Sequence, residues 1–402
     1  MTEAVSRDDA PTRRDIFKLA GAGVAAATVI SAKATPAFAQ VAEEVNTPTL
    51  TLARKGIDKA LDVINVDYLE EAVNEVYTEG VRVFVMNGSG KQWTLAENQR
   101  AWGDYVFTPH RLSGLGKEDI DLSIDLLGLK LPHPFIITPF GSHGIHHPLA
   151  EVATAIGGAQ SGALSCYSSA STSAMEEITK ASDAPKFFQI YLDVDDGKNQ
   201  ELLVRAKGAG FKGIVFTMDS IAQSSSDEYV RLGKNRPWLP YGNFDEGKST
   251  KFKINLGWSD VGMIAKASGL PVVVKGITRA EDALKAIESG ASAIQVSNHG
   301  GRSLDGTPAT ISVLPEIADA VQGKAPVIFD SGIRRGTDVV KALALGADAV
   351  AIGRPVMYGL ALGGASGVDS VLSYFHRETV EVMVQCGARS VAELDRTHVR
   401  RV

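Results

Sequence analysis

From about residue 132 onward, short apolar runs alternate with amphipathic stretches, and this alternation occurs eight times. The amphipathic stretches, such as RAEDALKAIESG and GTDVVKALALG, each close on a glycine that suits the carboxyl end of a helix. Strands that are apolar along almost their whole length are typical of parallel sheets covered by helices. Eight such units predict an α/β protein with a closed (β/α)8 TIM barrel; an open doubly wound sheet is the alternative. The expected strands lie at 134–140, 162–168, 186–192, 213–220, 271–277, 293–300, 326–333 and 349–356.

Each apolar run becomes polar at its carboxyl end. In a barrel these ends meet at one mouth, which is where such proteins carry their sites. The polar residues concerned are Thr138, Ser165, Gln189, Tyr191, Thr217, Asp219, Lys275, Ser297, His299, Asp330 and Arg354.

The chain before the barrel divides into two parts. Residues 40–131 are expected to form an extension with two helices and a hairpin at 125–134 that closes the lower end of the barrel, and residues 132–402 form the barrel domain. One connection, 221–257, is longer than barrel loops usually are, and we expect it to act as a lid.

Residues 1–39 have the character of a targeting segment. Arg13-Arg14 is followed by a weakly apolar Ala/Gly run, and Ala37-Phe38-Ala39 supplies a small-residue cleavage site. The segment resembles a twin-arginine export signal, which carries folded proteins and so predicts a periplasmic protein. The alternative, an uncleaved membrane anchor, would need an apolar stretch of about 20 residues, and the run here is shorter.

The composition of the 402-residue chain, 44% hydrophobic and 22% charged, is that of an ordinary globular protein. The net charge of −6 argues against nucleic acid as a partner. The only two cysteines, Cys166 and Cys386, exclude a disulfide framework and a cysteine-rich metal or iron–sulfur site. We therefore expect no metal site.

The last two strand ends favour a phosphate. Asp330 to Arg334 follow the seventh strand, and Gly353-Arg354 follow the eighth. Glycine amides at Gly332 and Gly353, together with two guanidiniums, suit a phosphate dianion, which barrels commonly bind at these loops.

Two further strand ends suggest acid–base chemistry. A histidine with a nearby carboxylate can accept a proton, and His299 and Asp219 both lie at strand ends with Arg302 close by. Lys275 would stabilise negative charge on a reduced flavin. The competing role for Lys275 is the Schiff-base lysine of a class I aldolase.

Several blocks resemble the FMN-dependent L-2-hydroxy-acid oxidases and dehydrogenases, the lactate oxidase and glycolate oxidase groups above all. These blocks are QWTLAEN, KGI, SNHGGR and FDSGIRRGTDVVKALALGADAVAIGRP, and the resemblance runs from about residue 61 to the C-terminus. It implies bound FMN, a homotetramer, and oxidation of a small 2-hydroxy acid to the 2-oxo acid. The electron acceptor would be dioxygen or a periplasmic redox carrier.

The resemblance also implies roles for individual residues. His299 would take the substrate hydroxyl proton while the α-hydrogen passes to flavin N5, and Asp219 would stabilise the imidazolium. Arg302 would bind the substrate carboxylate, Tyr191 would hydrogen-bond the substrate, and Lys275 would support the anionic flavin. Contacts to the flavin ring, ribityl chain and phosphate would come from Pro139, Phe140, Gly141, Ser165, Gln189, Thr217, Ser297, Asp330, Gly332, Arg334, Gly353 and Arg354.

Two substrate-binding positions depart from the family pattern. Phe84 stands where the family has a carboxylate-binding tyrosine, and Ser226 stands where it has a second arginine. A two-residue insertion also falls within 165–173. Each lost charge-assisted hydrogen bond is worth about 1.5–3 kcal/mol, so we expect L-lactate and glycolate to be poor substrates. The pocket would then take a bulkier or less acidic substrate, or loop 221–257 would compensate; a flavin-binding barrel without turnover of 2-hydroxy acids is the remaining alternative.

Overall fold

The computed structural model describes residues 56–222, 224–233, 237, 240–244 and 251–402, and the targeting segment predicted at 1–39 lies outside them. Eight parallel strands close into a barrel in the order β10-β11-β4-β5-β6-β7-β8-β9, as the apolar runs predict, so the open doubly wound alternative is wrong. The seam is the pairing of β11 with β4, where Val350 lies opposite Phe135. The strands are β4 (Phe135–Ile137), β5 (Leu164–Ser168), β6 (Lys186–Ile190), β7 (Gly213–Thr217), β8 (Val272–Ile277), β9 (Ala293–Val296), β10 (Val327–Asp330) and β11 (Ala349–Ile352).

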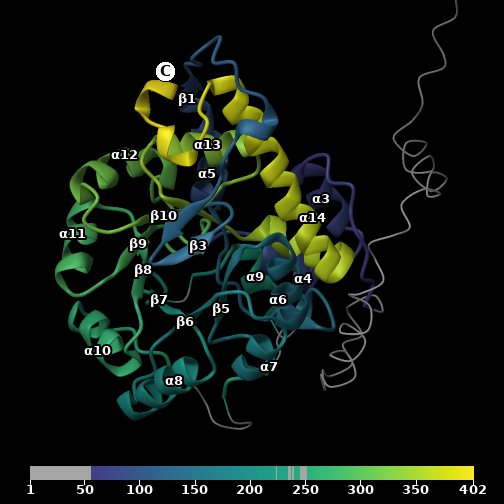
Figure 1. Ribbon diagram of the computed structural model, residues 1–402. Helices are drawn as coiled ribbons and strands as arrows, with labels where there is room; N and C mark the ends of the chain where they lie inside the picture. The colour runs from purple at the N-terminus through teal and green to yellow at the C-terminus, as the bar shows by residue number, and fades with distance from the viewer. Residues whose placement is uncertain (1–55, 223, 234–236, 238–239, 245–250) are drawn as a thin grey trace, which may run out of the picture. The chain divides into compact units, whose positions relative to one another are not determined.

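Helices surround the strands on the outside (Figure 1). The longest, α14, follows the last strand and is interrupted at Gly363 and Gly364, where the backbone leaves helical geometry. The helices that follow the strands are α6 (Ala150–Ser161), α7 (Met175–Lys180), α8 (Asp196–Gly208), α9 (Asp227–Arg231), α10 (Ser259–Ser268), α11 (Ala280–Glu288), α12 (Thr310–Val321), α13 (Gly336–Ala344) and α14 (Arg354–Cys386), with a short η3 (His143–Ile145) before α6.

The barrel interior is layered. Because side chains alternate between the two faces of a strand, the inward residue two positions after a core residue lies one layer closer to the mouth. The apolar layer contains Phe187, Val215, Val273, Ala293 and Ile328. Two positions on in each strand stand Gln189, Thr217, Lys275, Gln295 and Asp330, all buried. The interior therefore changes from apolar to polar within one layer, and this polar layer is the floor of the mouth.

The lower end of the barrel is closed by the hairpin expected at 125–134. Strands β2 (Ile124–Leu126) and β3 (Leu129–Leu131) pair antiparallel. Leu126 and Leu131 belong to the same buried cluster as the apolar layer of the barrel. The hairpin thus keeps water out of the core from below.

The N-terminal extension, as far as it is described, packs beside the mouth. It contains α3 (Val66–Val73), α4 (Glu79–Met86), α5 (Trp93–Arg100), η1 (Ala101–Asp104), β1 (Tyr105–Phe107) and η2 (Lys117–Asp119). Helices α3 and α5 lie within 61–77 and 92–105, the stretches in which the sequence predicts the two helices of the extension, whereas α4 was not predicted. Its apolar residues Val81, Val83 and Val85 alternate with a period of two, a pattern typical of a strand.

Among the contacts that join this extension to the barrel, two come from α5 and η1. The side chains of Asn98 and Asn298 exchange two hydrogen bonds of 2.9 and 2.8 Å across 200 positions of sequence. The indole of Trp102 donates to the carbonyl of Gly332 at 3.0 Å. At the other end of the chain, η5 (Val391–Glu393) and η6 (Arg396–His398) lead to β12 (Val399–Arg401), which pairs antiparallel with β1. In the part of the chain that the structure describes, no helix combines the length and the apolar character needed to cross a membrane.

Candidate active site

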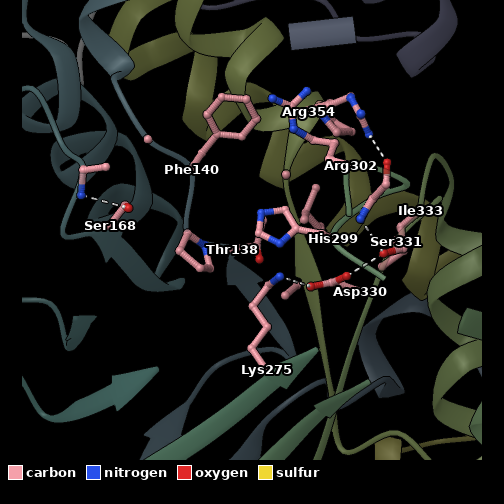
Figure 2. Close-up of a pocket in the computed structure, with 18 of the residues that line it drawn as sticks. Thr138, Phe140, Ser168, Lys275, His299, Arg302, Asp330, Ser331, Ile333 and Arg354 are labelled. Carbon is pink, nitrogen blue, oxygen red and sulfur yellow. Dashed lines mark hydrogen bonds and ion pairs between the residues drawn. The ribbon is translucent and has the colours of Figure 1, made fainter. Parts of the chain in front are cut away.

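A cavity opens at the carboxyl ends of the strands and holds about 1080 Å³ of empty space, counting its open mouth. Figure 2 shows its side chains converging from many separate loops. Of the residues proposed from the sequence, the cavity is lined by Phe84, Pro139, Phe140, Gly141, Tyr191, Lys275, His299, Arg302, Asp330, Gly332, Arg334, Gly353 and Arg354.

His299 and Asp219 form a hydrogen-bonded pair at this mouth. Nδ1 of His299 lies 2.8 Å from Oδ1 of Asp219, and Oδ2 of Asp219 has no partner among the described residues. Burial alone would raise the pKa of Asp219, but His299 and Lys275 outweigh it and hold the pKa below its ordinary value. Asp219 is therefore an ionised acceptor for the imidazole N–H, and Nε2 is the ring nitrogen left for a substrate.

The backbone at His299 is strained. His299 has a φ of 59°, and Gly300 and Gly301 follow with φ values of 64° and 75°. A histidine in this left-handed region is uncommon and is held there by its surroundings. The His299 backbone N–H donates to Oγ of Ser297 at 3.1 Å. Ser297, predicted as a flavin contact, is not among the residues lining the cavity, and its hydroxyl fixes the turn that carries His299.

Lys275 rises from the floor of the cavity toward Asp330, with 3.9 Å between Nζ and Oδ2 (Figure 2). Burial would lower the pKa of this lysine, but Asp219 and Asp330 outweigh it and raise the pKa. A Schiff-base lysine needs the opposite shift, because only the neutral amine attacks a carbonyl. Lys275 is a fixed positive charge under the cavity, and the aldolase alternative finds no support here.

Arg302 is held against the extension. Its Nη1 donates to the carbonyl oxygens of Phe84 and Asn87 at 2.5 and 3.0 Å, and its guanidinium lies 4.9 Å from the centre of the Phe84 ring. Phe84 lies in the last turn of α4, the helix that the sequence did not predict. The aromatic ring and the carbonyl of Phe84 thus position the guanidinium of Arg302.

Three arginines meet at one side of the cavity with little compensating negative charge. Among the described residues, Arg302 and Arg354 form no ion pair, and Arg334 has only Glu70 at 3.9 Å. Burial, and then the neighbouring Arg302 and Arg334, lower the pKa of Arg354 to about 9. A buried cluster of positive charge requires an anion, and a phosphate dianion supplies one.

The two predicted phosphate arginines are not equivalent. Arg354 donates from Nε, Nη1 and Nη2 to the carbonyl oxygens of Val85, Gly300 and Asn87, at 2.8, 3.1 and 3.2 Å. Nε of Arg334 has no partner in the described part of the chain. Arg334 is consequently the freer donor, and Arg354 also holds the extension in place.

The ring-binding predictions divide into three cases. Pro139, Phe140 and Gly141 line the cavity. Gln189 and Thr217 are buried in the polar layer, and Nε2 of Gln189 has no partner among the described residues, which leaves a donor for a carbonyl of a bound ring. Ser165 was wrong.

Ser165 faces outward because it alternates with the core residues Leu164 and Cys166. A side chain placed on Gly158 of α6 would come within 2.6 Å of the Ser165 hydroxyl, so that hydroxyl points at the helix layer. Ser168, three positions further along β5, lines the cavity and donates to Oε1 of Gln189 at 2.6 Å. The period of two along β5, counted from Cys166, would have favoured Ser168.

The second altered position, Ser226, does not line the cavity. It is buried as the N-cap of α9, accepts from the Tyr229 backbone N–H at 3.1 Å, and accepts from Nδ2 of Asn87 at 3.0 Å. The serine therefore ties the long loop to the extension. The lid expected at 221–257 lies partly outside the described residues, but Tyr241 within it lines the cavity and was missed.

An FMN molecule fits this donor set. The arginine cluster matches its phosphate, the polar layer with the unpaired Gln189 amide matches its ring carbonyls, and Lys275 matches the charge of its reduced form. A (β/α)8 barrel with these groups and a carboxylate-paired histidine at its mouth has the character of a flavin-dependent oxidoreductase.

Comparison with known proteins assigns the family. The chain belongs to the FMN-dependent dehydrogenase family, whose profile matches residues 73–401, and FMN is its cofactor. An L-lactate oxidase of Lactobacillus jensenii is 40% identical over 86% of this chain and 87% of the relative. Glycolate oxidase of Spinacia oleracea is 38% identical over 84% of this chain and 96% of the relative. The crystal structure of a putative lactate oxidase from Pediococcus acidilactici superposes with a TM-score of 0.83 at 39% identity, covering 87% of this chain and 98% of that one.

Proposed function

We propose that this protein oxidises an L-2-hydroxy acid to the corresponding 2-oxo acid with FMN. The single observation that carries the proposal is the hydrogen bond of His299 to Asp219, because His299 lines the same cavity as Arg302, which forms no ion pair among the described residues. Relatives named as lactate oxidase and glycolate oxidase support the same reaction class.

The chain's residues divide the work as follows. Arg302 binds the substrate carboxylate and so orients carbon 2. Nε2 of His299 accepts the hydroxyl proton, and the ionised Asp219 stabilises the positive charge that forms on the imidazole. Tyr191, which lines the cavity beside them, hydrogen-bonds the substrate. Bound FMN supplies the acceptor for the hydrogen and electron pair that leave carbon 2.

The remaining site residues hold the cofactor. Arg334 and Arg354 would bind its phosphate together with the backbone at Gly332 and Gly353. Asp330 would bind the ribityl chain, and Lys275 would stabilise negative charge on the reduced ring. Pro139, Phe140 and Gly141 would lie along the ring.

We further propose export, a homotetramer and a choice of two electron acceptors. Arg13-Arg14 and the cleavage site at Ala37-Phe38-Ala39 support twin-arginine export to the periplasm. There the electrons would pass to dioxygen or to a periplasmic redox carrier. Fractionation of cells that produce the full chain, with Arg13→Lys/Arg14→Lys as the control, tests the export; retention of the wild type in the cytoplasm would refute it.

An anaerobic spectrum tests the reaction. The protein carries FMN, with bands near ~370 and ~450 nm that bleach on two-electron reduction. Addition of a panel of L-2-hydroxy acids should bleach the flavin, and an equimolar 2-oxo acid should form. A flavin that dithionite bleaches but no 2-hydroxy acid does would contradict the proposed function and favour a flavin-binding role.

A further inference from the structure

Tyr241 brings an aromatic ring into the active-site cavity from the long loop after β7. It lines the cavity with Phe84 and Tyr191, and the Phe84 ring in turn packs on Tyr229 with 5.8 Å between ring centres. These rings belong to three different segments of the chain. Part of the cavity wall is thus aromatic, although a small polar substrate would not require it.

The residues beside Tyr241 are clamped to the segment between β5 and α7. The Gly242 N–H donates to the Ser171 carbonyl at 2.9 Å, and a side chain at position 242 would collide with backbone at 172–174. The buried Asn243 amide accepts from the Met175 N–H at 2.9 Å. It also donates to the Ser169 carbonyl at 3.2 Å and the Ser171 hydroxyl at 2.8 Å. Both polar atoms of the Asn243 side chain form hydrogen bonds, and these bonds hold the backbone that carries Tyr241 in place.

The clamped segment is itself built on a buried carboxylate. Glu151 of α6 accepts from the backbone N–H groups of Thr172 and Ser173 at 3.0 and 2.9 Å, and from that of His143 at 2.9 Å. The serine-rich stretch that departs from the family pattern is therefore an ordered platform. Its backbone carbonyls and one hydroxyl receive the loop that bears Tyr241.

Arg302, on the polar side of the cavity, is held by the carbonyl oxygens of Phe84 and Asn87. Arg302 keeps its positive charge for a carboxylate, but the ring of Phe84 lies across its guanidinium at 4.9 Å in place of a hydroxyl. With the carboxylate directed to Arg302 and the hydroxyl to His299, the third substituent of carbon 2 must face another part of the wall. Tyr241 and Phe84 offer it apolar surface.

We propose that Tyr241 is a specificity-determining residue that contacts the side chain of the substrate and selects 2-hydroxy acids with a large apolar or aryl group. This inference rests on the proposed function, because it assigns a substrate class to the same cavity. Asn243 acts only as a positioning residue for Tyr241.

The test compares L-3-phenyllactate with L-lactate as reductants of the bound flavin. In the wild type, kcat/KM for phenyllactate should exceed that for lactate by about tenfold or more, the discrimination expected from one added apolar group. Tyr241→Ala should reduce this ratio about tenfold, and Asn243→Ala should reduce it by about threefold or more. Tyr241→Phe should keep the ratio within about threefold, because it removes the hydroxyl and leaves the ring.

The half-exposed Tyr68 of α3 provides the matched control, since Tyr68→Ala removes the same ring away from the cavity. A ratio in Tyr241→Ala equal to that in Tyr68→Ala would overturn the proposal. Loss of both substrates in Tyr241→Phe would also overturn it, because the phenol would then bind the carboxylate.

A binding measurement separates this inference from the proposed reaction. Phenylpyruvate and pyruvate are titrated into the oxidised holoenzyme and followed by the flavin spectrum, without turnover. Tighter binding of phenylpyruvate that Tyr241→Ala abolishes supports the role of Tyr241 even if no 2-hydroxy acid reduces the flavin. Equal affinity for the two oxo acids overturns it even if turnover is seen.

Discussion

Nδ1 of His299 lies 2.8 Å from Oδ1 of Asp219, although 80 positions separate the two residues in sequence. Strands β7 and β9 bring them together across β8, and Lys275 of β8 stands between them in chain order. The pair directs the ring nitrogen Nε2 of His299 toward the cavity and supplies a negative charge behind the imidazole. Both features are what a proton acceptor needs.

Asp219→Asn should slow flavin reduction by about 10²- to 10⁴-fold, because the amide keeps the shape but no longer stabilises a charged imidazole. The pKa of Asp219 is held low, so the carboxylate is ionised throughout the neutral range and the loss should persist from pH 6 to 9. Stopped-flow reduction at saturating substrate measures it. The exposed Asp62 supplies the control Asp62→Asn; a defect below about threefold in Asp219→Asn would refute the role.

Arg334 and Arg335 are neighbours that face different partners. Arg335 pairs with Glu378 at 3.4 Å, whereas Arg334 lines the cavity. Arg334→Ala should raise the Kd for FMN by about 10- to 150-fold, the loss of one charge-assisted hydrogen bond. Fluorescence titration of FMN into apoprotein measures this. Arg335→Ala should bind FMN within about threefold of the wild type, and equal losses in the two variants would contradict a phosphate role for Arg334.

Phe84→Tyr restores a hydroxyl at the cavity wall without disturbing the backbone carbonyl that positions Arg302. If the missing hydroxyl weakens the binding of small acids, this variant should lower the KM for L-lactate about tenfold, the value of one hydrogen bond to a carboxylate. Steady-state turnover of L-lactate measures the change. A wild type that already turns over lactate at micromolar KM, with no gain in Phe84→Tyr, would refute the hypothesis of a poor small substrate.

Asp338 predicts a pH dependence of stability. Its Oδ2 accepts from the backbone N–H groups of Arg334 and Arg335 at 2.9 and 3.0 Å, yet burial outweighs these bonds and raises its pKa to about 6. A raised folded-state pKa means that this group contributes stability below its unfolded pKa, near 4, and loses it as the pH rises through about 6.

Asp338→Asn keeps the acceptor and removes the ionisation. Relative to the wild type, it should therefore gain about 2 kcal/mol in the free energy of unfolding between pH 4.5 and 7. Urea unfolding of the FMN-loaded protein at the two pH values measures the gain, with Asp62→Asn as the control. A difference between Asp338→Asn and the wild type that does not change with pH would show that the carboxyl is not buried in its charged form.

The barrel could be predicted from the sequence because its strands are buried on both faces and separated by capped helices. All eight apolar runs became strands, and the residues two positions beyond the core became the polar floor. Ser165 does not line the cavity because a position at a strand end does not determine which face of the strand a side chain occupies. Helix α4 was not predicted because Val81, Val83 and Val85 repeat with the period of a strand, although tertiary packing made the segment helical.

The place of Tyr241 in the cavity wall could not have been predicted from the residues next to it in sequence. Its position depends on Asn243 and on the segment 169–175, and no periodicity links these residues. The same holds for the contact of Ser226 with Asn87, where the substituted residue joins two loops rather than leaving an empty place in the cavity. Of the two departures from the family pattern, Phe84 lines the cavity and Ser226 does not, and only the structure showed this difference.

The seam between β11 and β4 sets the order of events during synthesis. The barrel can close only when the strand of Val350 has been synthesised and pairs with the strand of Phe135. The cavity is lined by Pro139, which follows one of these strands, and by Arg354, which follows the other. A ribosome-bound chain that ends before these late residues emerge lacks both the closed wall and part of the arginine cluster. We therefore expect flavin capture only late in synthesis, and nascent chains of this protein should be colourless until almost the whole sequence has left the ribosome.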